Sequence, residues 1–286
     1  MTMKASGVFW VLPFLLLGCK PAEQSTATQA LPTAWEAARI IATIEVSNPS
    51  EFARLDTLIS LSLNELGVTG GPMQVWAGDD AQPTQLVDDD GDAIHDRLVF
   101  LTSLEAAGTR SFVITDRLSG EQPAARARAE VSIKEGGEWQ DAVYAGGTFK
   151  NVDQLTNPPQ YTDHSEYIRY EGPGIESDLV GYRVYLDWRN GFDIFGKKKP
   201  GLVLQDIGQD GYDSYHEMAD WGADILKVGT SLGMGGYGYW DGEKTVLVSD
   251  VAKRSVSIRS NGPIHSSFEL GYKGWNTGAQ TVDLKA

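Results

Sequence analysis

The sequence predicts an all-β protein. Short runs of apolar residues, or of alternating apolar and polar residues, recur along the chain, and Gly, Pro, Asn and Asp separate them as they separate strands. Aromatic residues and glycine are both abundant, because the chain of 286 residues holds 8 tryptophans, 11 tyrosines and 32 glycines. Aromatic residues favour strands and glycine favours turns. We therefore expect a loop-rich β fold with little helix.

The strand pattern divides into two modules. Five strand-like runs occupy residues 40–46, 58–63, 73–77, 98–101 and 110–115. Short strands at this spacing are typical of a β-sandwich, and we place this first module at residues 36–118. Residues 117–129, with Gly120, Pro123 and four alanines, form a connecting segment. A second module runs from residue 130 to residue 286.

Residues 1–19 resemble a bacterial lipoprotein signal. Lys4 precedes an apolar run over residues 8–17, which suits a secretory signal and is too short to span a bilayer. The run ends in Leu16-Leu17-Gly18-Cys19, which is similar to a lipobox in all four residues, and Cys19 is the only cysteine. An ordinary signal peptide with an incidental cysteine is the alternative. We expect diacylglycerol on Cys19, which would become the mature N-terminus.

Residues 20–35 are rich in Ala, Thr, Gln, Ser and Pro without an apolar period, as expected of a flexible tether. Lys20 stands where retention in the inner membrane is associated with aspartate. The lipobox resemblance therefore implies an outer-membrane lipoprotein that faces the periplasm or the cell surface and contacts the membrane through its lipid anchor alone. Because Cys19 carries the lipid, no disulfide is available and burial must stabilise the fold.

The charge of the chain argues against nucleic acid as a partner. The formal net charge is -15 and the pI is about 4.6, a balance that repels polyanions. Basic residues of the second module nevertheless stand beside aromatic ones, as in Tyr167-Ile168-Arg169-Tyr170. Local positive sites can therefore form on an acidic protein. Aromatic faces stack on sugar rings, although most such rings pack in cores.

An acidic loop in the first module predicts a calcium site. Carboxylates recur at alternate positions over residues 88–96, a spacing that can turn their oxygens toward one ion. The candidate ligands are Asp88, Asp90, Asp92 and Asp96. The match is imperfect, because Ala93 and Val99 stand where a calcium-binding loop needs glycine and glutamate. An acidic hairpin connection, in which Asp and Gly merely favour the turn, is the alternative.

Titratable and aromatic residues concentrate between residues 163 and 239. Strand alternation would place Tyr167, Arg169 and Glu171 on one face. In a second strand over residues 181–190, alternation would place four polar residues on one face: Arg183, Tyr185, Asp187 and Arg189. Four polar groups that face one way are costly in a core but suit a cleft. A solvated sheet face with cross-strand ion pairs is an equally common arrangement.

Residues 213–226 differ from the strands around them. If this segment is a short helix, His216, Asp220 and Asp224 line one face, because they are four residues apart. A zincin motif is excluded, since Asp220 stands where a second histidine is required. His216 is one of only four histidines and sits among carboxylates, a common setting for functional histidines. A histidine that only caps or pins the segment is the alternative.

Two long stretches resemble a family of exported bacterial proteins known as a domain of unknown function (serial 4861). The first covers residues 170–198 and includes Asp187-Trp188-Arg189-Asn190, and the second covers residues 215–233. The resemblance extends from about Ile40 to the end of the chain. It implies that the second module is a mutarotase-like β-supersandwich, found among proteins that bacteria use to degrade acidic polysaccharides.

Members of this family are usually longer than this chain. The sequence stops in an alternating strand pattern over residues 280–286 without a closing turn. The resemblance therefore also implies that the supersandwich module at residues 130–286 is incomplete.

These observations predict an exported lyase or hydrolase that acts on uronate-containing polysaccharide or its oligosaccharides. In a lyase, an arginine would neutralise the substrate carboxylate and acidify the C5 proton, while His and Tyr residues move protons. The candidate catalytic residues are His164, Tyr170, Arg189 and His216. The candidate substrate-binding residues are Arg169, Glu171, Arg183, Asp187, Trp188, Trp221, Tyr237 and Trp240.

Two other classes of function stay open at this point. A noncatalytic glycan-binding lipoprotein would use Trp188, Trp221, Tyr237 and Trp240 as stacking surfaces. A structural or assembly lipoprotein would bind no ligand. Acidic carbohydrate is the partner expected for the enzyme, and calcium could replace arginine in neutralising a uronate. Convergence of the four catalytic candidates on one site would favour the enzyme.

Overall fold

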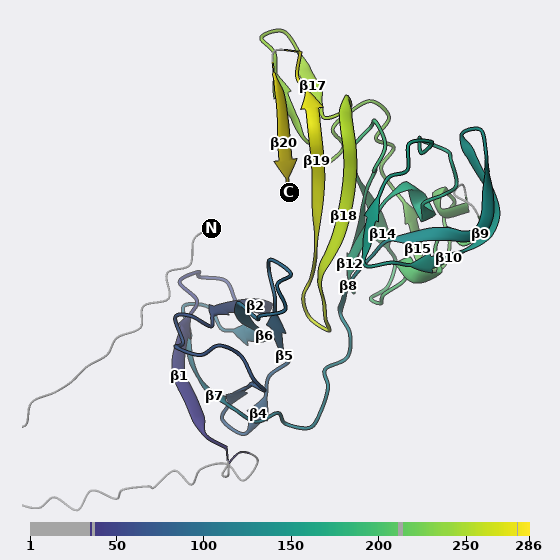
Figure 1. The fold of residues 1–286 in the computed structure, drawn as a ribbon. Coiled ribbons are helices and arrows are strands. Elements are labelled where there is room, and N and C mark those ends of the chain that lie inside the picture. Colours follow the sequence, from purple (N-terminus) through teal and green to yellow (C-terminus); the bar gives the residue numbers. More distant parts are fainter. Residues whose placement is uncertain (1–34, 36–37, 211–213, 279) are drawn as a thin grey trace, which may run out of the picture. The chain divides into compact units, whose positions relative to one another are not determined.

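The computed structural model describes residues 35, 38–210, 214–278 and 280–286 and shows an almost wholly β protein. Over these residues the chain forms strands β1 to β20 and three short 3-10 helices, η1 to η3 (Figure 1). The prediction of an all-β fold is confirmed. Within the described residues, no helix has the length and apolar character needed to cross a bilayer. Cys19 and the expected tether lie outside the described residues.

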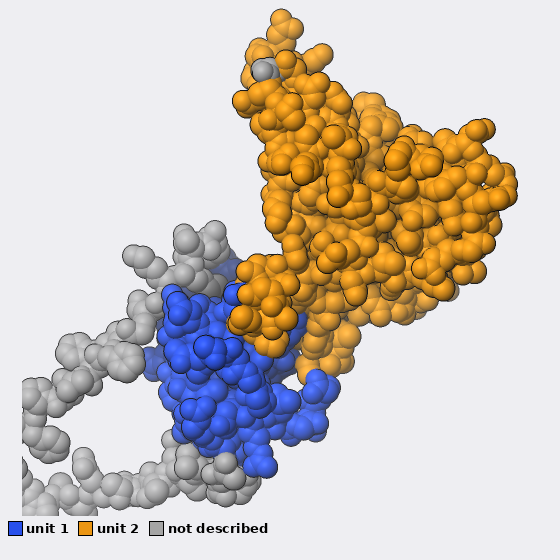
Figure 2. Space-filling view, in the orientation of Figure 1, with its two compact units in different colours: residues 1–86, 96–122 blue, residues 87–95, 123–286 orange. Residues whose placement is uncertain are grey.

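The chain forms two compact units, shown in different colours in Figure 2. Unit 1 comprises residues 1–86 and 96–122, and unit 2 comprises residues 87–95 and 123–286. The expected connecting segment, residues 117–129, is wrong at its end, because residues 127–129 belong to strand β8 (Ala127–Glu130). This strand pairs with β12 (Gly174–Ser177), so the backbone groups of the segment are used in a sheet.

Unit 1 contains two antiparallel sheets. The first sheet joins, in order, β1 (Ile40–Ser47), β7 (Thr109–Thr115), β3 (Gln74–Ala77) and β4 (Asp80–Ala81). The second joins β2 (Arg54–Ser62), β6 (Arg97–Leu104) and β5 (Thr84–Val87). Apolar residues of both sheets share one core, in which the ring centroids of Phe100 and Phe112 lie 5.0 Å apart. The predicted strands of this unit are therefore confirmed, while sandwich packing stays a prediction.

Unit 2 contains two larger sheets and two hairpins. A five-stranded sheet joins β15 (Gly222–Asp224), β14 (Phe192–Lys197), β13 (Val180–Val184), β12 and β8. A four-stranded sheet joins β11 (Gln154–Thr156), β18 (Val251–Asn261), β19 (Ser266–Asn276) and β20 (Thr281–Lys285). The hairpins are β9 (Ser132–Gln140) with β10 (Val143–Asn151), and β16 (Gly238–Trp240) with β17 (Thr245–Leu247).

The largest core of unit 2 lies on the inner face of the four-stranded sheet. Val256, Leu270 and Tyr272 of β18 and β19 are buried there, together with Val184 and Leu186 from the end of β13 and beyond it. Burial of such apolar side chains is the main stabilising term in a fold without disulfides. The core therefore holds the segment after β13, which carries Asp187 and Arg189, against β18 and β19. The supersandwich arrangement itself stays a prediction.

One face of the five-stranded sheet buries charged side chains. Arg183 of β13 pairs with Asp193 of β14, and Glu176 of β12 forms an ion pair with Lys197 of β14. The cover over this face comes from the segment with η2 (Leu204–Asp206) and η3 (Ser214–His216), through a cluster of Tyr170, Phe195, Leu204, Ile207 and Tyr215. Charges buried in this way must be paired, and these are.

Three local expectations are wrong. Residues 169–171 are not strand but the 3-10 helix η1 (Arg169–Glu171), so Tyr167, Arg169 and Glu171 do not share a strand face. The strand expected over residues 181–190 ends at Val184. The helix expected over residues 213–226 is absent from its described part, where η3 ends at His216 and β15 begins at Gly222. In each of these segments, contacts made by individual side chains determine the backbone conformation, and the alternation of apolar and polar residues does not.

The side chain of Asn261 links strand β8 of the five-stranded sheet to the end of strand β18 of the four-stranded sheet. The amide of Asn261, at the end of β18, accepts a hydrogen bond of 3.0 Å from the Ala129 N–H and donates one of 2.9 Å to the Ala129 carbonyl. It thereby satisfies both backbone groups of Ala129 on one side of β8. The two residues are 132 positions apart in the sequence.

Candidate functional site

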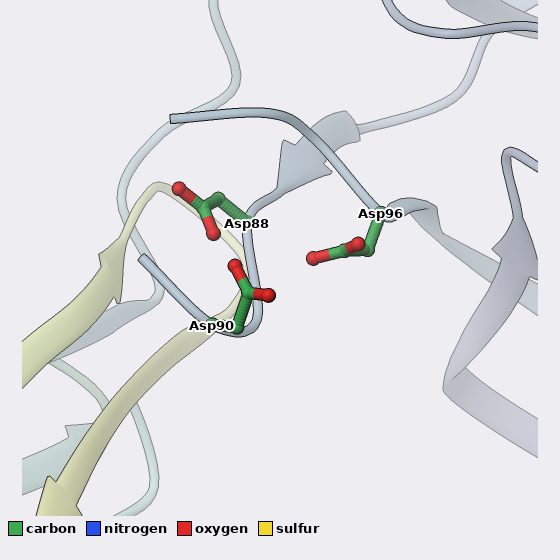
Figure 3. A group of neighbouring side chains, drawn as sticks. All are labelled: Asp88, Asp90 and Asp96. Carbon is green, nitrogen blue, oxygen red and sulfur yellow. The ribbon is translucent and has the colours of Figure 1, made fainter. Parts of the chain in front are cut away.

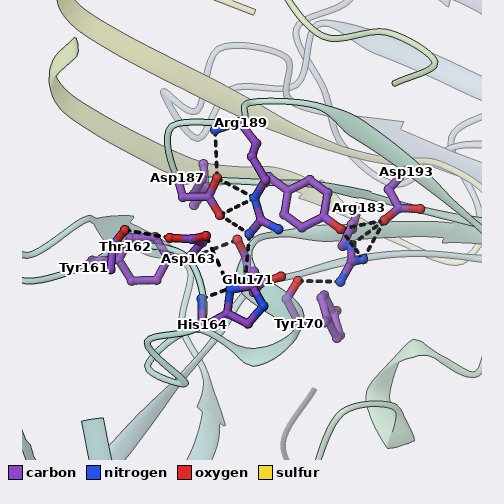
Figure 4. Close-up of polar contacts among 12 residues, drawn as sticks. Tyr161, Thr162, Asp163, His164, Tyr170, Glu171, Arg183, Asp187, Arg189 and Asp193 are labelled. Carbon is purple, nitrogen blue, oxygen red and sulfur yellow. Dashed lines mark hydrogen bonds and ion pairs between the residues drawn. The ribbon is translucent and has the colours of Figure 1, made fainter. Parts of the chain in front are cut away.

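Arg189 is the centre of a polar cluster beyond the end of β13 (Figure 4). Its Nη2 donates to Oε1 of Glu171 at 2.8 Å, and its Nε donates to Oδ1 of Asp187 at 2.9 Å. Its guanidinium carbon lies 3.8 Å from the centroid of the Tyr185 ring. Burial raises the pKa of the Asp187 carboxyl, although the hydrogen bonds and charge of Arg189 lower it. Arg189 is therefore already neutralised by two carboxylates.

His164 lies at the edge of this cluster and is open to solvent. Its backbone N–H donates to Oε1 of Glu171 at 2.9 Å. Its Nδ1 lies 3.4 Å from Oδ2 of Asp163 and 4.0 Å from Oε1 of Glu171. The His164 side chain is 58% exposed, whereas that of Glu171 is 7% exposed. A buried carboxylate thus positions an accessible imidazole.

The backbone around the cluster is held in an unusual conformation. Of the nine non-glycine residues with positive φ among the described residues, five lie between residues 164 and 190: His164, Glu166, Tyr170, Glu171 and Asn190. Each such residue costs on the order of 1 kcal/mol relative to its relaxed backbone. Hydrogen bonds and packing must offset this cost. Strain of this kind gathers at sites where geometry is imposed for function.

Arg183 links the cluster to the buried face of the five-stranded sheet. Its Nε donates to Oδ2 of Asp193 at 2.8 Å, its Nη2 donates to Oδ2 of Asp224 at 2.7 Å, and its Nη1 donates to the Tyr215 hydroxyl at 2.9 Å. Its guanidinium carbon lies 4.3 Å from the centroid of the Tyr185 ring. Tyr185 therefore contacts the guanidinium groups of both Arg183 and Arg189.

His216 is the second partly exposed histidine of this network. Its Nδ1 lies 3.1 Å from Oδ2 of Asp224, and its side chain is 32% exposed whereas that of Asp224 is 1% exposed. Burial raises the pKa of Asp224 to about 7, against the lowering effect of the Arg183 charge. An imidazole held through Nδ1 by a buried carboxylate has the geometry of a general base and its orienting group.

The two histidines belong to one contiguous network. The guanidinium carbons of Arg189 and Arg183 lie 3.8 and 4.3 Å from the centroid of the Tyr185 ring, and Arg183 Nη1 donates to the Tyr215 hydroxyl at 2.9 Å. The Tyr215 ring in turn lies 4.7 Å from the His216 ring. Contacts thus run from His164 through Glu171 and Arg189 toward Arg183, Tyr215 and His216. Three of the four catalytic candidates, His164, Arg189 and His216, are joined in this way.

Trp188 lies beside the exposed end of the network. Its side chain is 41% exposed. Burial raises the pKa of Asp163, but hydrogen bonds from Thr162 and Trp188 and the charge of Arg189 outweigh it and lower the pKa overall. The indole therefore reaches Asp163, next to His164. An exposed aromatic face beside polar groups is the arrangement on which a sugar ring can stack.

Tyr170 and Arg169 require correction as site residues. The side chain of Tyr170 is buried, and its hydroxyl donates to Oε1 of Glu130 on β8. Arg169 is buried beside it and also pairs with Glu130. These hydroxyl and guanidinium groups face the covered side of the sheet and are shut off from any ligand in solution. Only the Tyr170 carbonyl takes part in the network, as an acceptor for Arg183 Nη1 at 3.2 Å.

The other six substrate-binding candidates lie in different surroundings. Arg183 and Asp187 have side chains that are fully buried, so they support neighbouring residues instead of contacting a ligand. Trp221 is half-buried against Phe195, and Tyr237 is half-buried against Phe192. Trp240, on β16, is 66% exposed and makes no hydrogen bond to the network within the described residues. Glu171 holds Arg189 and the His164 backbone.

The acidic loop between β5 and β6 brings together three of its four candidate ligands. Single carboxylate oxygens of Asp88, Asp90 and Asp96 all lie within 4.8 Å of one another (Figure 3). The fourth, Asp92, is outside this group, and its Oδ1 accepts a hydrogen bond from the Ile94 N–H. Hydrogen bonds from backbone N–H groups, led by that of Gly91, lower the pKa of Asp88. Calcium at this loop stays a prediction, since these bonds also suit a turn.

Sequence reasoning missed several members of the network. Asp193 faces Arg183 across the β13–β14 pairing, so a hairpin register could have revealed it. Tyr161 donates its hydroxyl to the Glu171 carbonyl at 2.9 Å from a loop with no periodic pattern. Asp224 was noted only as part of a helix face that does not exist. No local signal indicated that it binds Arg183.

Comparison with known protein families assigns the chain to one family. A family model described as a domain of unknown function (DUF4861) matches residues 46–286. No curated protein and no solved structure shows significant similarity to the chain. The match covers unit 2, residues 46–86 and 96–122 of unit 1, and every residue of the polar network. The chain therefore belongs to the DUF4861 family of domains of unknown function.

Proposed function

We propose that this protein acts on uronate-containing polysaccharide or its oligosaccharides as a lyase, with His216 as the base. The observation that carries the proposal is the His216–Asp224 pair, in which a partly exposed imidazole is held by a buried carboxylate. That carboxylate is fixed in turn by Arg183. Positioned general bases of this kind contribute about 10²- to 10⁴-fold to a rate.

In this proposal the two histidines carry the proton transfers. With Nδ1 directed at Asp224, Nε2 of His216 carries the lone pair that takes the C5 proton of the uronate. The electrons of that C–H bond form the C4–C5 double bond, and the C4–O bond breaks. His164, beside Asp163, supplies a proton to the leaving oxygen. A cationic group must neutralise the substrate carboxylate so that C5 becomes acidic.

The experiment compares the full chain with a His216→Gln variant on a panel of uronate polymers. The unsaturated product absorbs in the ultraviolet because its double bond is conjugated to the carboxylate. We expect the variant to lose on the order of 10²-fold or more in rate while its circular dichroism is unchanged. His95→Gln, in the acidic loop, is the matched control and should retain full activity. Full activity of folded His216→Gln would contradict the assignment.

Noncatalytic glycan binding is the second candidate, and the exposed Trp188 beside Asp163 favours it. An exposed indole next to hydrogen-bonding groups can hold a sugar without any proton transfer. Binding of uronate oligosaccharides without unsaturated product from any polymer of the panel would select this function over the lyase.

The proposed setting is the outer membrane, with the protein anchored through lipid on Cys19. The lipobox resemblance of residues 16–19 supports this setting, and an exported enzyme of polysaccharide degradation would meet its substrate there. Two acyl chains on one cysteine give stable anchoring, whereas a single chain does not. The mutarotase-like fold and the link to acidic polysaccharide come into the proposal through the family resemblance.

A further inference from the structure

Three half-buried aromatic rings lie together on hairpin β9–β10 and on the segment before η1. The hairpin lies at one margin of unit 2 (Figure 1). Trp139 and Tyr144 face each other across it, and their ring centroids lie 5.3 Å apart. The Tyr167 ring lies 5.2 Å from that of Trp139 and 5.1 Å from that of Tyr144. All three residues keep part of their surface exposed to solvent. We call this group the aromatic platform.

The rings of the platform are fixed, although Trp139 and Tyr144 lie outside the hydrophobic cores of the described chain. The Tyr144 hydroxyl donates to the Gly137 carbonyl at 3.0 Å, which holds the ring over that glycine. A Cβ atom at Gly137 would lie 2.7 Å from Cε1 of Tyr144, so a larger residue would displace the ring. Across the hairpin, a Cβ atom at Gly146 would approach only the Cα of Gly137, at 3.8 Å, so the surface beside the rings is open. Rings that are fixed before binding lose little entropy when a ligand stacks on them.

The platform adjoins the His164 end of the polar network. The Tyr144 N–H donates to the carbonyl of Ser165 at 2.8 Å, and Ser165 follows His164 in the chain. Tyr167 belongs to the same segment, and its carbonyl accepts a hydrogen bond of 2.9 Å from the Lys134 N–H of β9. Hairpin β9–β10 is thus bonded to the segment that carries the exposed imidazole. A sugar chain that contacts His164 can therefore place a neighbouring unit on the platform.

The charges on the hairpin indicate which kind of sugar suits the platform. Both lysines of the hairpin are paired with glutamates, at 2.9 Å for Lys134 with Glu166 and at 2.7 Å for Lys150 with Glu135. Glu138 and Asp141 of the same hairpin are exposed and form no ion pair with any described residue. The hairpin therefore carries uncompensated negative charge, which repels a uronate carboxylate. An uncharged sugar stacks on aromatic rings through its apolar C–H face and meets no such repulsion.

We propose that the aromatic platform binds an uncharged sugar unit next to the uronate on which the histidines act. Trp139 offers the largest stacking surface, and Tyr144 and Tyr167 support its ring. The inference rests on the proposed function and deepens it, because it identifies the substrate as a mixed polysaccharide in which uronate and neutral sugars are neighbours. The lyase step itself is unchanged, since no residue of the platform donates or accepts a proton in it.

The experiment is calorimetric titration of the full chain with three sets of oligosaccharides. The neutral set contains β-linked oligomers of glucose, xylose and mannose, the acidic set contains oligomers of galacturonate and mannuronate, and the mixed set contains fragments of hyaluronan and glucuronoxylan. We expect at least one neutral oligosaccharide to bind with an affinity that added salt leaves unchanged, because no charged contact is involved. At least one mixed fragment should bind about tenfold or more tightly than the acidic oligomers, as an added stacking contact predicts.

Trp139→Ala should weaken the binding of neutral and mixed oligosaccharides by about tenfold or more. Trp139→Leu keeps an apolar side chain on the hairpin but has no flat face, so it should show the same loss while its circular dichroism is unchanged. Trp139→Phe should recover part of the affinity. Phe149→Ala is the matched control, because Phe149 lies on the same hairpin but packs against Lys134. It should bind as the unaltered chain does.

Two results would overturn the platform as a binding site. One is neutral or mixed binding that survives both Trp139→Ala and Trp139→Leu, and the other is no binding of any neutral or mixed oligosaccharide by the unaltered chain. The failure of this inference and of the lyase are separate results. Binding that depends on Trp139, without unsaturated product from any polymer, supports the platform and removes the lyase. Unsaturated product together with either overturning result removes the platform and leaves the lyase in place.

Discussion

Asp224 Oδ2 is shared between His216 Nδ1, at 3.1 Å, and Arg183 Nη2, at 2.7 Å. One carboxylate oxygen thus joins a partly exposed imidazole to an arginine with no exposed surface. Because Arg183 also binds Asp193, the position of His216 depends on the pairing of β13 with β14. The candidate base is therefore held by the core of the five-stranded sheet, although it belongs to a short 3-10 helix on its cover.

Arg183→Met should strongly destabilise unit 2. The substitution keeps much of the side-chain volume but leaves Asp193 and Asp224 buried without their cation. Breaking a buried ion pair from one side costs about 3–5 kcal/mol. Urea unfolding measures the change in the free energy of unfolding. Arg39→Met, which breaks an exposed pair with Asp116 in unit 1, should change it by less than about 1 kcal/mol. Equal effects of the two variants would refute the prediction.

Asp224→Asn should remove part of the pH dependence of stability. Burial raises the pKa of Asp224 from 3.8 to about 7. Since the folded-state value is the higher one, the stabilisation from its proton is complete below 3.8 and is lost as the pH rises through about 7. Stability of the unaltered protein should fall across this window, by up to about 1.4 kcal/mol per pH unit.

Urea unfolding between about pH 4 and pH 8 checks this prediction. Asp224→Asn should show a flatter profile than the unaltered protein. Asp241→Asn is the control, because hydrogen bonds from the backbone of Lys244 and Glu243 lower the pKa of Asp241 and place its titration below the window. Parallel profiles for Asp224→Asn and the unaltered protein would count against a buried proton at Asp224.

Trp188→Ala should weaken glycan binding without loss of fold. The indole is 41% exposed, so its removal leaves no large cavity, and loss of a stacking surface costs on the order of tenfold in affinity. Trp188→Phe should recover part of the affinity. Trp240→Ala removes an indole that is 66% exposed and outside the network, and it should bind as the unaltered protein does. Titration calorimetry with uronate oligosaccharides distinguishes the variants, and unaltered binding by Trp188→Ala would eliminate stacking at this position.

Cys19→Ala should release the protein from membranes. The acyl chains supply the hydrophobic attachment, and no other anchor is proposed. Fractionation of cells after a salt wash measures the bound share of each variant. Cys19→Ser removes the same acceptor and should behave like Cys19→Ala. Recovery of either variant in the washed membrane fraction would show that lipid on Cys19 is not the anchor.

The strands were predictable because their signal is local. The runs that include Ile44, Leu61 and Phe112 alternate or are continuously apolar, and each forms a strand of unit 1. The network was only partly predictable. Alternation grouped Arg183, Tyr185, Asp187 and Arg189 on one strand face, but the strand ends at Val184. The four residues contact one another through an irregular segment with its own hydrogen bonds.

The remaining site residues carried no local signal. Asp224 meets Arg183 across 41 positions of sequence, and Tyr170 meets Glu130 across 40. Contacts of this range depend on the register of several strands, which periodicity does not specify.

The hydrogen bonds between Asn261 and Ala129 tie the order of folding to the order of synthesis. Their partners are 132 positions apart, and Asn261 stands near the end of the chain. Loops of this length close late, because their entropy is lost before the contacts form. Strand β8 can pair with β12 early, whereas the backbone groups of Ala129 that face Asn261 gain their partners only after β18 has formed.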